Sequence, residues 1–214
     1  MRIQPRKSRP LPPQPPASGC ELGEPLQQSG RTCVRYRGRK LVYFGGCDYF
    51  RLSSHPAMLR AIGEGLRRYG LNVAASRTTT GNHPLYEQLE ASLAEFFGAE
   101  SAVLVSSGYL TGQVAAQALA GQFSHVLVDE RAHACLSDAA RILDCPILKF
   151  QHRTVAAAAA AARQCGPQAR LLLITDGLFA HDGQVAPLDL YLRRLPRRTW
   201  FLVDDAHAAG VLGR

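Results

Sequence analysis

The stretch Thr199-Trp200-Phe201-Leu202-Val203-Asp204-Asp205-Ala206-His207 decides the fold that we expect for this chain. It opens with an apolar, β-branched and aromatic run without alternation. Such a run is typical of a strand buried on both faces, as in a parallel sheet covered by helices. In such sheets ligands bind beyond the carboxyl ends of the strands. We therefore expect Asp204 and His207 to stand at the edge of a binding site.

Strand-like and helix-like segments alternate before this stretch. Strand patterns lie at 101–105, 126–129, 147–148 and 171–174, and helix patterns at 109–119, 134–143, 155–163 and 188–195. The alternation predicts an α/β fold with a mostly parallel sheet, flanking helices and right-handed crossovers.

The N-terminal part has a different organisation. We expect a small hairpin over 31–44 that turns at Arg37-Gly38, and helices over 56–69 and 85–97. A Pro- and Arg-rich start indicates a disordered tail, and an organelle transit peptide is the weaker alternative because prolines oppose an amphipathic helix. The expected parts are a tail at 1–30, the hairpin and helices at 31–98, and an α/β region at 99–214.

Composition narrows the function classes. The chain has 214 residues and a formal net charge of +8. The arginines are scattered and no recognition motif appears, so we favour anionic small ligands over nucleic acid. No secretory signal and no apolar run of membrane-spanning length is present, so we expect a cytoplasmic protein without a membrane partner. The six cysteines show no CxxC spacing and are expected to be reduced.

Three segments carry candidate binding chemistry. Ser106-Ser107-Gly108-Tyr109 lies between a predicted strand and helix, where free N–H groups and hydroxyls suit a phosphate, although these residues are also ordinary turn and cap residues. His133 follows a strand end and suits stacking on a flat ligand, or is simply solvated. Asp204 needs a cationic partner if it is buried, and either a ligand or an arginine meets that need.

Metal binding is an alternative role for the histidines and aspartates in these segments. Asp204, Asp205, His207 and His133 carry metal-ligating side chains, but no HxH or HExxH spacing joins them. We therefore expect no metal in this protein.

Taken together, these segments from about Asp48 to Arg214 resemble the α-oxoamine synthases, a family of pyridoxal 5′-phosphate (PLP) enzymes. The order and spacing of six short stretches carry the resemblance. They are Asp48–Leu52 with Ser54-His55-Pro56, Gly81–Leu85, Ser107-Gly108-Tyr109, Asp129–Ala134, Thr175–Phe179 with Asp182-Gly183, and Val203–His207.

The resemblance implies a role for each of five residues. Gly108 and Tyr109 would bind the PLP phosphate through backbone N–H groups. His133 would stack on the pyridine ring and face the substrate, Asp204 would pair with the ring nitrogen, and His207 would hydrogen-bond the phenolic oxygen. The implied reaction joins an amino-acid carbanion to an acyl-CoA, with the ring as electron sink. The full-length form would be a homodimer.

The resemblance also implies what this sequence lacks. The Schiff-base lysine of the family lies in a Ser/Thr-x-x-Lys segment beyond Arg214, so no catalytic residue is assigned here. Ala180 and Asp176 stand where the family usually has Ser and Glu. We expect the N-terminal half of an acyltransferase, inactive as this fragment, or alternatively a catalytically dead interaction or regulatory subunit. An aminotransferase of the same fold fits the motifs less well.

The implied fold is the truncated large domain of PLP fold type I, in which seven strands follow the order 3-2-4-5-6-7-1. This chain would supply strands 1 to 5. The first strand, 101–105, would then lack its neighbours, and open sheet edges favour aggregation. We therefore expect the isolated chain to be marginally stable.

Overall fold

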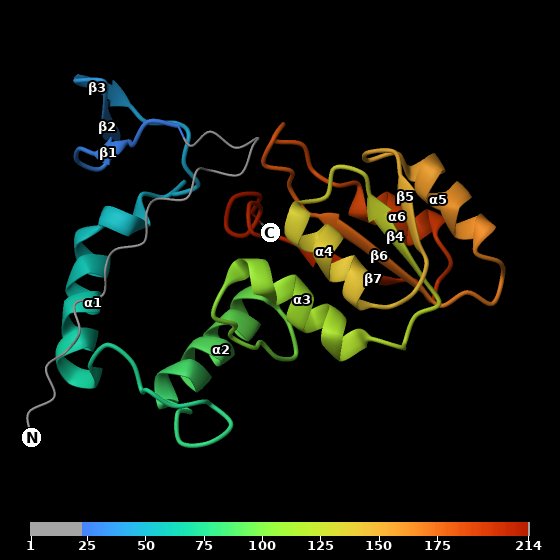
Figure 1. The fold of residues 1–214 in the computed structure, drawn as a ribbon, viewed down its shortest axis with the longest axis horizontal. Helices are drawn as coiled ribbons and strands as arrows, with labels where there is room; N and C mark the ends of the chain where they lie inside the picture. Colours follow the sequence, from blue (N-terminus) through green and yellow to red (C-terminus); the bar gives the residue numbers. More distant parts are fainter. Residues whose placement is uncertain (1–22, 214) are drawn as a thin grey trace, which may run out of the picture. The chain divides into compact units, whose positions relative to one another are not determined.

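The computed structural model describes residues 23–213 (Figure 1). The chain forms two compact units, 1–68 and 69–214. The described part of the first unit holds an antiparallel sheet of β1 (Gln27–Gln28), β2 (Cys33–Tyr36) and β3 (Arg39–Val42). A short 3-10 turn, η1 (Leu52–Ser54), precedes helix α1 (Pro56–Tyr69), which reaches the boundary between the units.

The predicted hairpin over 31–44 is confirmed. Arg37 and Gly38 have φ angles of 49° and 73°, and two residues with positive φ form the tight turn that suits the twist of paired strands. β1 was not expected, because it lies inside the predicted tail of 1–30. The rest of that tail, up to residue 22, lies outside the described residues.

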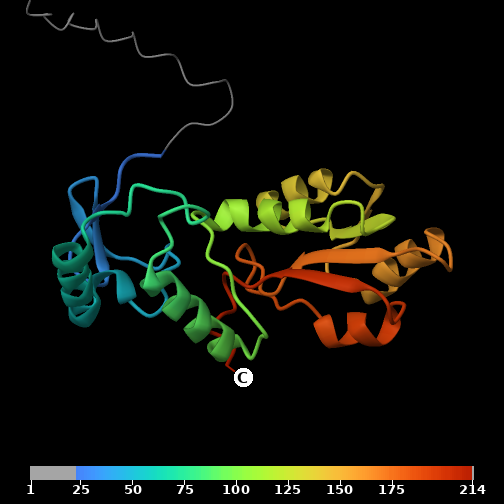
Figure 2. The ribbon, with the colours of Figure 1, turned by 90° about the horizontal axis from the view of Figure 1, so that it is seen from below.

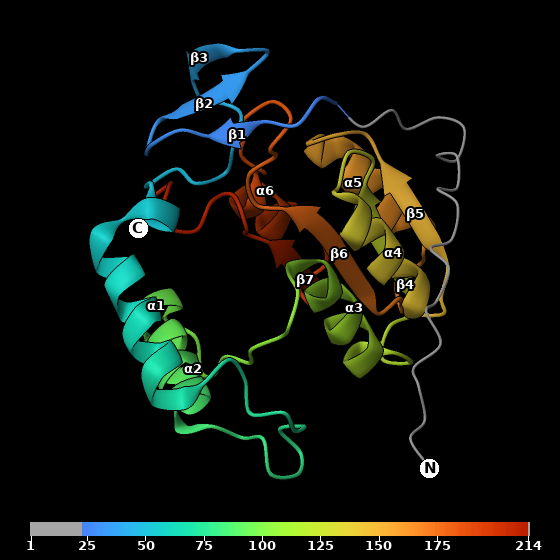
Figure 3. The ribbon, with the colours of Figure 1, turned by 60° about the vertical axis from the view of Figure 1, so that its left-hand side comes forward.

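The second unit contains the α/β region. Its helices are α2 (Pro84–Phe97), α3 (Gly108–Leu119), α4 (Ala134–Ile142), α5 (Val155–Gln164) and α6 (Leu188–Arg194). Its strands are β4 (His125–Asp129), β5 (Ile147–Phe150), β6 (Leu171–Asp176) and β7 (Trp200–Asp204). All four are parallel in the order β5-β4-β6-β7, which is the 3-2-4-5 part of the expected order (Figure 3).

Helices cover both faces of this sheet, and neighbouring strand residues pack into opposite layers. Val126, Val128 and Ile174 pack against α3 and α4, whereas Leu127 and Leu173 pack against α5 and α6. Figure 2 shows α3 and α4 on one side of the strands and α6 on the other. Because both faces are apolar, the strands read as continuous hydrophobic runs rather than alternating ones.

The predicted strand over residues 101–105 is wrong. This segment follows α2 without regular structure, and the Val103 side chain is 76% exposed. The N–H of Leu104 donates to the Glu90 carboxylate at 2.8 Å rather than to a strand. A strand exists only with a partner, and none of the described strands pairs with this segment.

The expectation that β7 is buried on both faces is also wrong. Trp200 is 56% exposed, and the remaining residues of β7 are half-buried. Within the described chain β7 pairs only with β6 and so forms an edge of the sheet. The fully buried run belongs to β6, which pairs with β4 and β7 and is buried at all six positions.

The division into units differs from the expected boundary at 98/99. α2 belongs to the second unit, where its Glu90 binds both Arg77 and the N–H of Leu104. These bonds tie the helix to the segments on either side of it. Among the described residues, no helix combines the length and apolar character that crossing a bilayer requires.

Candidate functional site

A cavity of 420 Å³ lies at the carboxyl ends of β6 and β7, beside the start of α3. This is within the range of about 300–1,000 Å³ that is usual for small-molecule sites. The five residues singled out from the sequence all line it, although they come from three separate parts of the chain. They are Gly108, Tyr109, His133, Asp204 and His207.

The first turn of α3 supplies backbone donors to this cavity. Ser107 is the N-cap, and its side chain makes no capping hydrogen bond to the helix. The first N–H groups of a helix have no partner within the helix, and the helix dipole adds partial positive charge there. Together these groups form a favourable site for an anion such as a phosphate.

Tyr109 connects α3 to α4. Its hydroxyl donates to Asp138, and this hydrogen bond, followed by burial, raises the pKa of Tyr109. The Tyr109 ring also lies edge-on to the His133 ring, with 6.4 Å between the ring centroids. The phenol is therefore a neutral side chain whose direction is set by a neighbouring helix.

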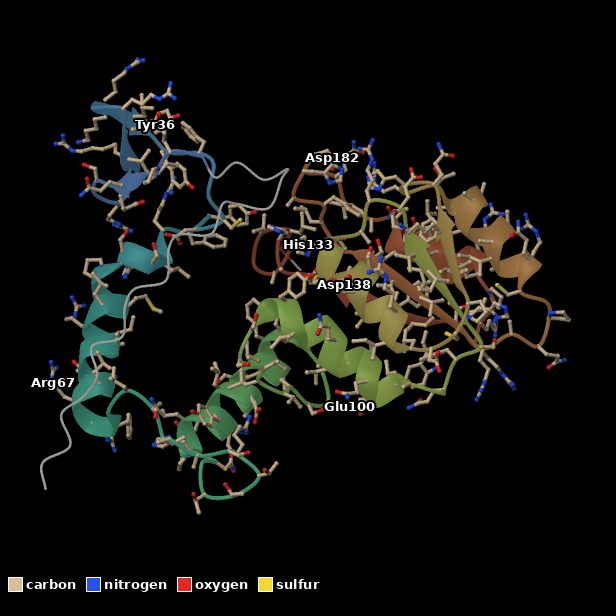
Figure 4. All side chains as sticks on the ribbon, viewed as in Figure 1. Tyr36, Arg67, Glu100, His133, Asp138 and Asp182 are labelled. Carbon is tan, nitrogen blue, oxygen red and sulfur yellow. The ribbon has the colours of Figure 1, made fainter. Side chains whose placement is uncertain are left out.

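His133 caps α4 with its imidazole, because its Nδ1 accepts the N–H of Cys135 at 3.3 Å. The backbone N–H of His133 donates to the Asp176 carboxylate at 2.9 Å. The residue is held from both sides, yet its ring remains exposed at the cavity, at the start of α4 in Figure 4. This placement suits an imidazole that stacks on a flat ligand.

Two carboxylates stand at neighbouring strand ends, since Asp176 and Asp204 are paired in the register of β6 and β7. Burial raises the pKa of Asp176, the hydrogen bond from the His133 N–H opposes this, and the charge of Asp204 adds to the increase. Asp204 accepts the N–H of Ala206 through Oδ1 at 3.1 Å. The floor of the cavity is therefore acidic and suits a ligand that presents a protonated nitrogen.

His207 lies in the turn that follows β7 and is half-buried at the cavity wall. It is three residues beyond Asp204, so one short segment presents both a carboxylate and an imidazole. Asp205 and Ala206, which lie between them, also line the cavity.

From the sequence, Cys135 had no role at the cavity beyond that of a reduced cysteine. Its Sγ lies 2.9 Å from His133 Nδ1 and 3.6 Å from the Asp204 carboxylate, so the thiol connects two cavity residues. Burial, followed by the charge of Asp204, raises the pKa of Cys135 to about 11, and the group stays a thiol at neutral pH. Its position two residues after His133 was the available signal. The described cysteines, including this one, are free.

Lysines do not contribute to the cavity in the described chain. The sequence contains Lys7, Lys40 and Lys149. Lys40 lies in β3 and Lys149 in β5, and neither lines the cavity, whereas Lys7 is outside the described residues. The described cavity therefore has donors for an anion, an acidic floor and imidazoles, but no amine.

Comparisons with known proteins agree with this picture. The profile of the family described as aminotransferase class I and II matches residues 40–214. The putative 8-amino-7-oxononanoate synthase of Phenylobacterium zucineum is 42% identical over 193 residues, which are 88% of this chain and 50% of that protein. The 8-amino-7-oxononanoate synthase of Maricaulis maris is 40% identical, over 86% of this chain and 47% of that protein. The chain thus spans about half the length of the curated relatives it matches.

Solved structures show the same fold. The serine palmitoyltransferase of Sphingomonas wittichii superposes with a TM-score of 0.78 at 25% identity, over 84% of this chain and 45% of that one. The 8-amino-7-oxononanoate synthase of Francisella tularensis, at 21% identity, superposes with a TM-score of 0.59. The predicted α/β class, fold type I and the resemblance to α-oxoamine synthases are confirmed.

Proposed function

Because the chain belongs to the aminotransferase class I and II family, we propose that its cavity binds PLP. The observation that carries this proposal is the meeting of Gly108, Tyr109, His133, Asp204 and His207 at one cavity. The chemistry of the donor set fits the ligand, since a phosphate, a flat ring and a protonated ring nitrogen each find a matching group.

Each residue then has a physical task. The backbone N–H groups of Gly108 and Tyr109 bind the phosphate at the start of α3. His133 stacks on the ring and forms one wall of the substrate site. Asp204 would accept a hydrogen bond from the protonated ring nitrogen and keep that nitrogen charged, because a carboxylate beside a cation favours its protonated form. His207 hydrogen-bonds the phenolic oxygen.

When bound, PLP supplies an electron sink that stabilises negative charge at the α-carbon of an amino acid. We propose that the whole protein joins such an amino acid to an acyl-CoA, as an acyltransferase of α-oxoamine synthase type. The names of the curated relatives support this reaction class. Asp204 is the residue of this chain that most directly supports the chemistry, through the ring nitrogen.

Catalysis needs more than the described cavity holds. A lysine normally anchors PLP and moves the α-proton, and the described lysines do not line the cavity. We propose that this chain by itself binds PLP without a covalent bond and does not turn over substrate. The same observation supports the alternative of a pseudoenzyme that acts as an interaction or regulatory subunit.

The test of cofactor binding uses pyridoxamine 5′-phosphate beside PLP, because the amine form cannot react with surface lysines. Titration followed by absorbance and tryptophan fluorescence is expected to show saturable binding of both compounds. Asp204→Asn and His133→Ala are expected to weaken it at least about tenfold, since each removes a direct contact. His125→Ala, a histidine outside the cavity, is the matched control and should leave affinity unchanged.

Equal affinities of the three variants and the wild type would contradict the proposed site. Catalysis is tested separately by incubating the chain with PLP, an amino acid and an acyl-CoA, and by measuring release of free CoA thiol. We expect none above the rate without protein. Release that depends on the chain and on PLP would refute the inactivity and leave the site assignment intact.

A further inference from the structure

We propose that His152, His181 and Asp182 bind a divalent transition metal of the zinc type, at a site distinct from the cavity described above. The three residues come from the loops that follow β5 and β6. None of them lines the cavity at the ends of β6 and β7. Figure 4 labels Asp182 in its loop beyond the sheet, apart from His133.

The two separations between the Asp182 carboxylate and the imidazole nitrogens fit a tetrahedral metal. The Asp182 Oδ2 atom lies 3.5 Å from Nε2 of His152 and 3.2 Å from Nε2 of His181. Metal–ligand bonds of about 2.0–2.2 Å at tetrahedral angles place neighbouring ligand atoms about 3.3–3.6 Å apart. One ligand atom from each residue lies within 4.8 Å of the other two, so a single ion can reach all three after a small adjustment.

The ring of His152 is already fixed for coordination. Its Nδ1 lies 2.8 Å from the Asp129 carboxylate, which is 1% exposed and also accepts the N–H groups of Arg131 and Arg153. A carboxylate only accepts, so Nδ1 carries the hydrogen, and in the neutral form of the ring Nε2 is then the nitrogen with the lone pair. Such carboxylate–histidine pairs orient metal ligands in many proteins.

The Nε2 atom of His152 is buried and makes no hydrogen bond of normal geometry, and its near neighbour is Asp182 Oδ2 at 3.5 Å. A buried polar atom without a well-placed partner is costly. The ring of Phe179 packs edge-on against the imidazole at a centroid distance of 4.4 Å. A metal ion would satisfy this nitrogen, which points toward Asp182.

Asp182 and His181 complete the set from one loop. The N–H of Gln184 donates to Asp182 Oδ1 at 3.0 Å, which leaves Oδ2 for the two imidazoles. His181 is exposed and tilted toward His152, with 5.5 Å between the ring centroids. Two imidazoles and one carboxylate are a donor set that zinc accepts, with water in the fourth position.

Arg131 is the feature that opposes binding. Its guanidinium Nη1 lies 3.3 Å from His181 Nε2 and brings a positive charge to the site. The side chain is exposed, so it can leave when a metal arrives. Arg131→Gln is therefore expected to tighten binding, because it removes both the charge and the competing donor.

Metal binding would strengthen the link between the loop after β5 and the loop after β6, which Arg153 Nε already joins by donating to the Val185 carbonyl at 2.9 Å. In the sheet, β4 lies between β5 and β6. Since an ion that binds only the folded chain stabilises it by mass action, we expect zinc to raise the melting temperature.

The test titrates Zn²⁺ into the chain without an affinity tag and without PLP, in competition with a chromophoric chelator. One ion per chain is expected. His181→Ala and Asp182→Asn should each weaken Zn²⁺ affinity at least about tenfold, because even mutations of residues that only hydrogen-bond to metal ligands cost about 10–100-fold. His181 is exposed, so its removal should leave folding intact, and circular dichroism verifies this.

Two control variants distinguish this metal site from other residues that could bind Zn²⁺. Cys135→Ser removes a ligand from the alternative metal-binding set of His133, Cys135 and Asp204, and it should leave the Zn²⁺ affinity unchanged. His125→Ala should likewise leave the Zn²⁺ affinity unchanged. With Co²⁺ as the probe, we expect a tetrahedral spectrum without the charge-transfer band of a thiolate. Failure of the wild type to bind Zn²⁺, or unchanged affinity in folded His181→Ala, would overturn the proposal, as would loss of binding in Cys135→Ser.

Discussion

Strand β6 and residues 101–105 have similar sequences and opposite structures. Leu-Leu-Leu-Ile-Thr-Asp in β6 is buried at all six positions between two neighbouring strands. Ser-Ala-Val-Leu-Val at 101–105 forms no strand, and its Val103 is 76% exposed. Both are β-branched and aliphatic runs bounded by polar residues. The difference teaches that composition marks a segment as able to form a strand, and partners on either side decide whether it does.

The two regions also differ in the carboxylate that each contacts. β6 ends at Asp176, whose carboxylate is buried and accepts the His133 N–H. Residues 101–105 are held by Glu90 of α2, which accepts the Leu104 N–H and pairs with Arg77 at 2.9 Å through Oε2. The Asp176 carboxylate is buried at the end of a sheet strand. The Glu90 carboxylate accepts the Leu104 N–H, which would otherwise donate to a neighbouring strand.

The largest expected difference comes from truncating apolar side chains in the two regions. Leu173→Ala in β6 removes a side chain with 0% exposure, and we expect the free energy of unfolding to fall by about 2–5 kcal/mol. Val103→Ala should change it by no more than about 0.5 kcal/mol, because the side chain already contacts solvent. Urea unfolding followed by circular dichroism measures both, and equal losses would show that residues 101–105 are packed in solution.

A smaller effect is expected from the carboxylate that holds residues 101–105. The hydrogen bond from Arg77, then that from the Leu104 N–H, lowers the pKa of Glu90 from 4.5 to about 2. A depressed folded pKa stabilises the fold above 4.5, and this contribution disappears as the pH falls toward 2. Glu90→Gln should therefore flatten the acid limb of a plot of stability against pH. An unchanged limb would mean that the ion pair does not form.

The smallest effect is expected at the end of β6, with the opposite sign. Burial raises the pKa of Asp176 while the His133 N–H partly offsets it, so the two influences cancel in part. A raised folded pKa means that stability falls as the pH rises from 3.8 through the folded pKa, and that the penalty is constant above it. Asp176→Asn should remove this decline and keep an acceptor for His133. A decline that persists in the variant would assign it to another group.

Most of the fold was predictable because its signals are local. Helix α2 ends before Gly98, whose φ of 62° suits glycine, and the hairpin turns at Arg37-Gly38. The order of the parallel strands followed from the family resemblance and from the rule that helices connect parallel strands. The exposed edge of β7 was not predictable from its apolar residues, since the run looks the same whether one or two neighbours are present.

The candidate site also contains residues that the sequence indicated and residues that only the structure revealed. Gly108, Tyr109, His133, Asp204 and His207 were singled out because the family resemblance implies a role for each, and their positions at strand ends and helix starts suit ligand binding. The contacts of Cys135 and Asp176 were not predictable, because they join residues 69 and 43 positions apart in the sequence. The cluster of His152, His181 and Asp182 was equally hidden, as its members lie in two loops without ligand spacing.

The sequence by itself determined the α/β class, the family and the residues that stand at strand and helix ends. It could do so because periodicity and caps are properties of contiguous residues, and because six separate stretches keep the order and spacing of the family. Only the tertiary structure showed that residues 101–105 form no strand and are held by Glu90 instead, that β7 is partly exposed among the described residues, and which separate loops bring imidazoles and carboxylates together. Those outcomes depend on hydrogen-bond partners and burial supplied by distant segments, which no local pattern encodes.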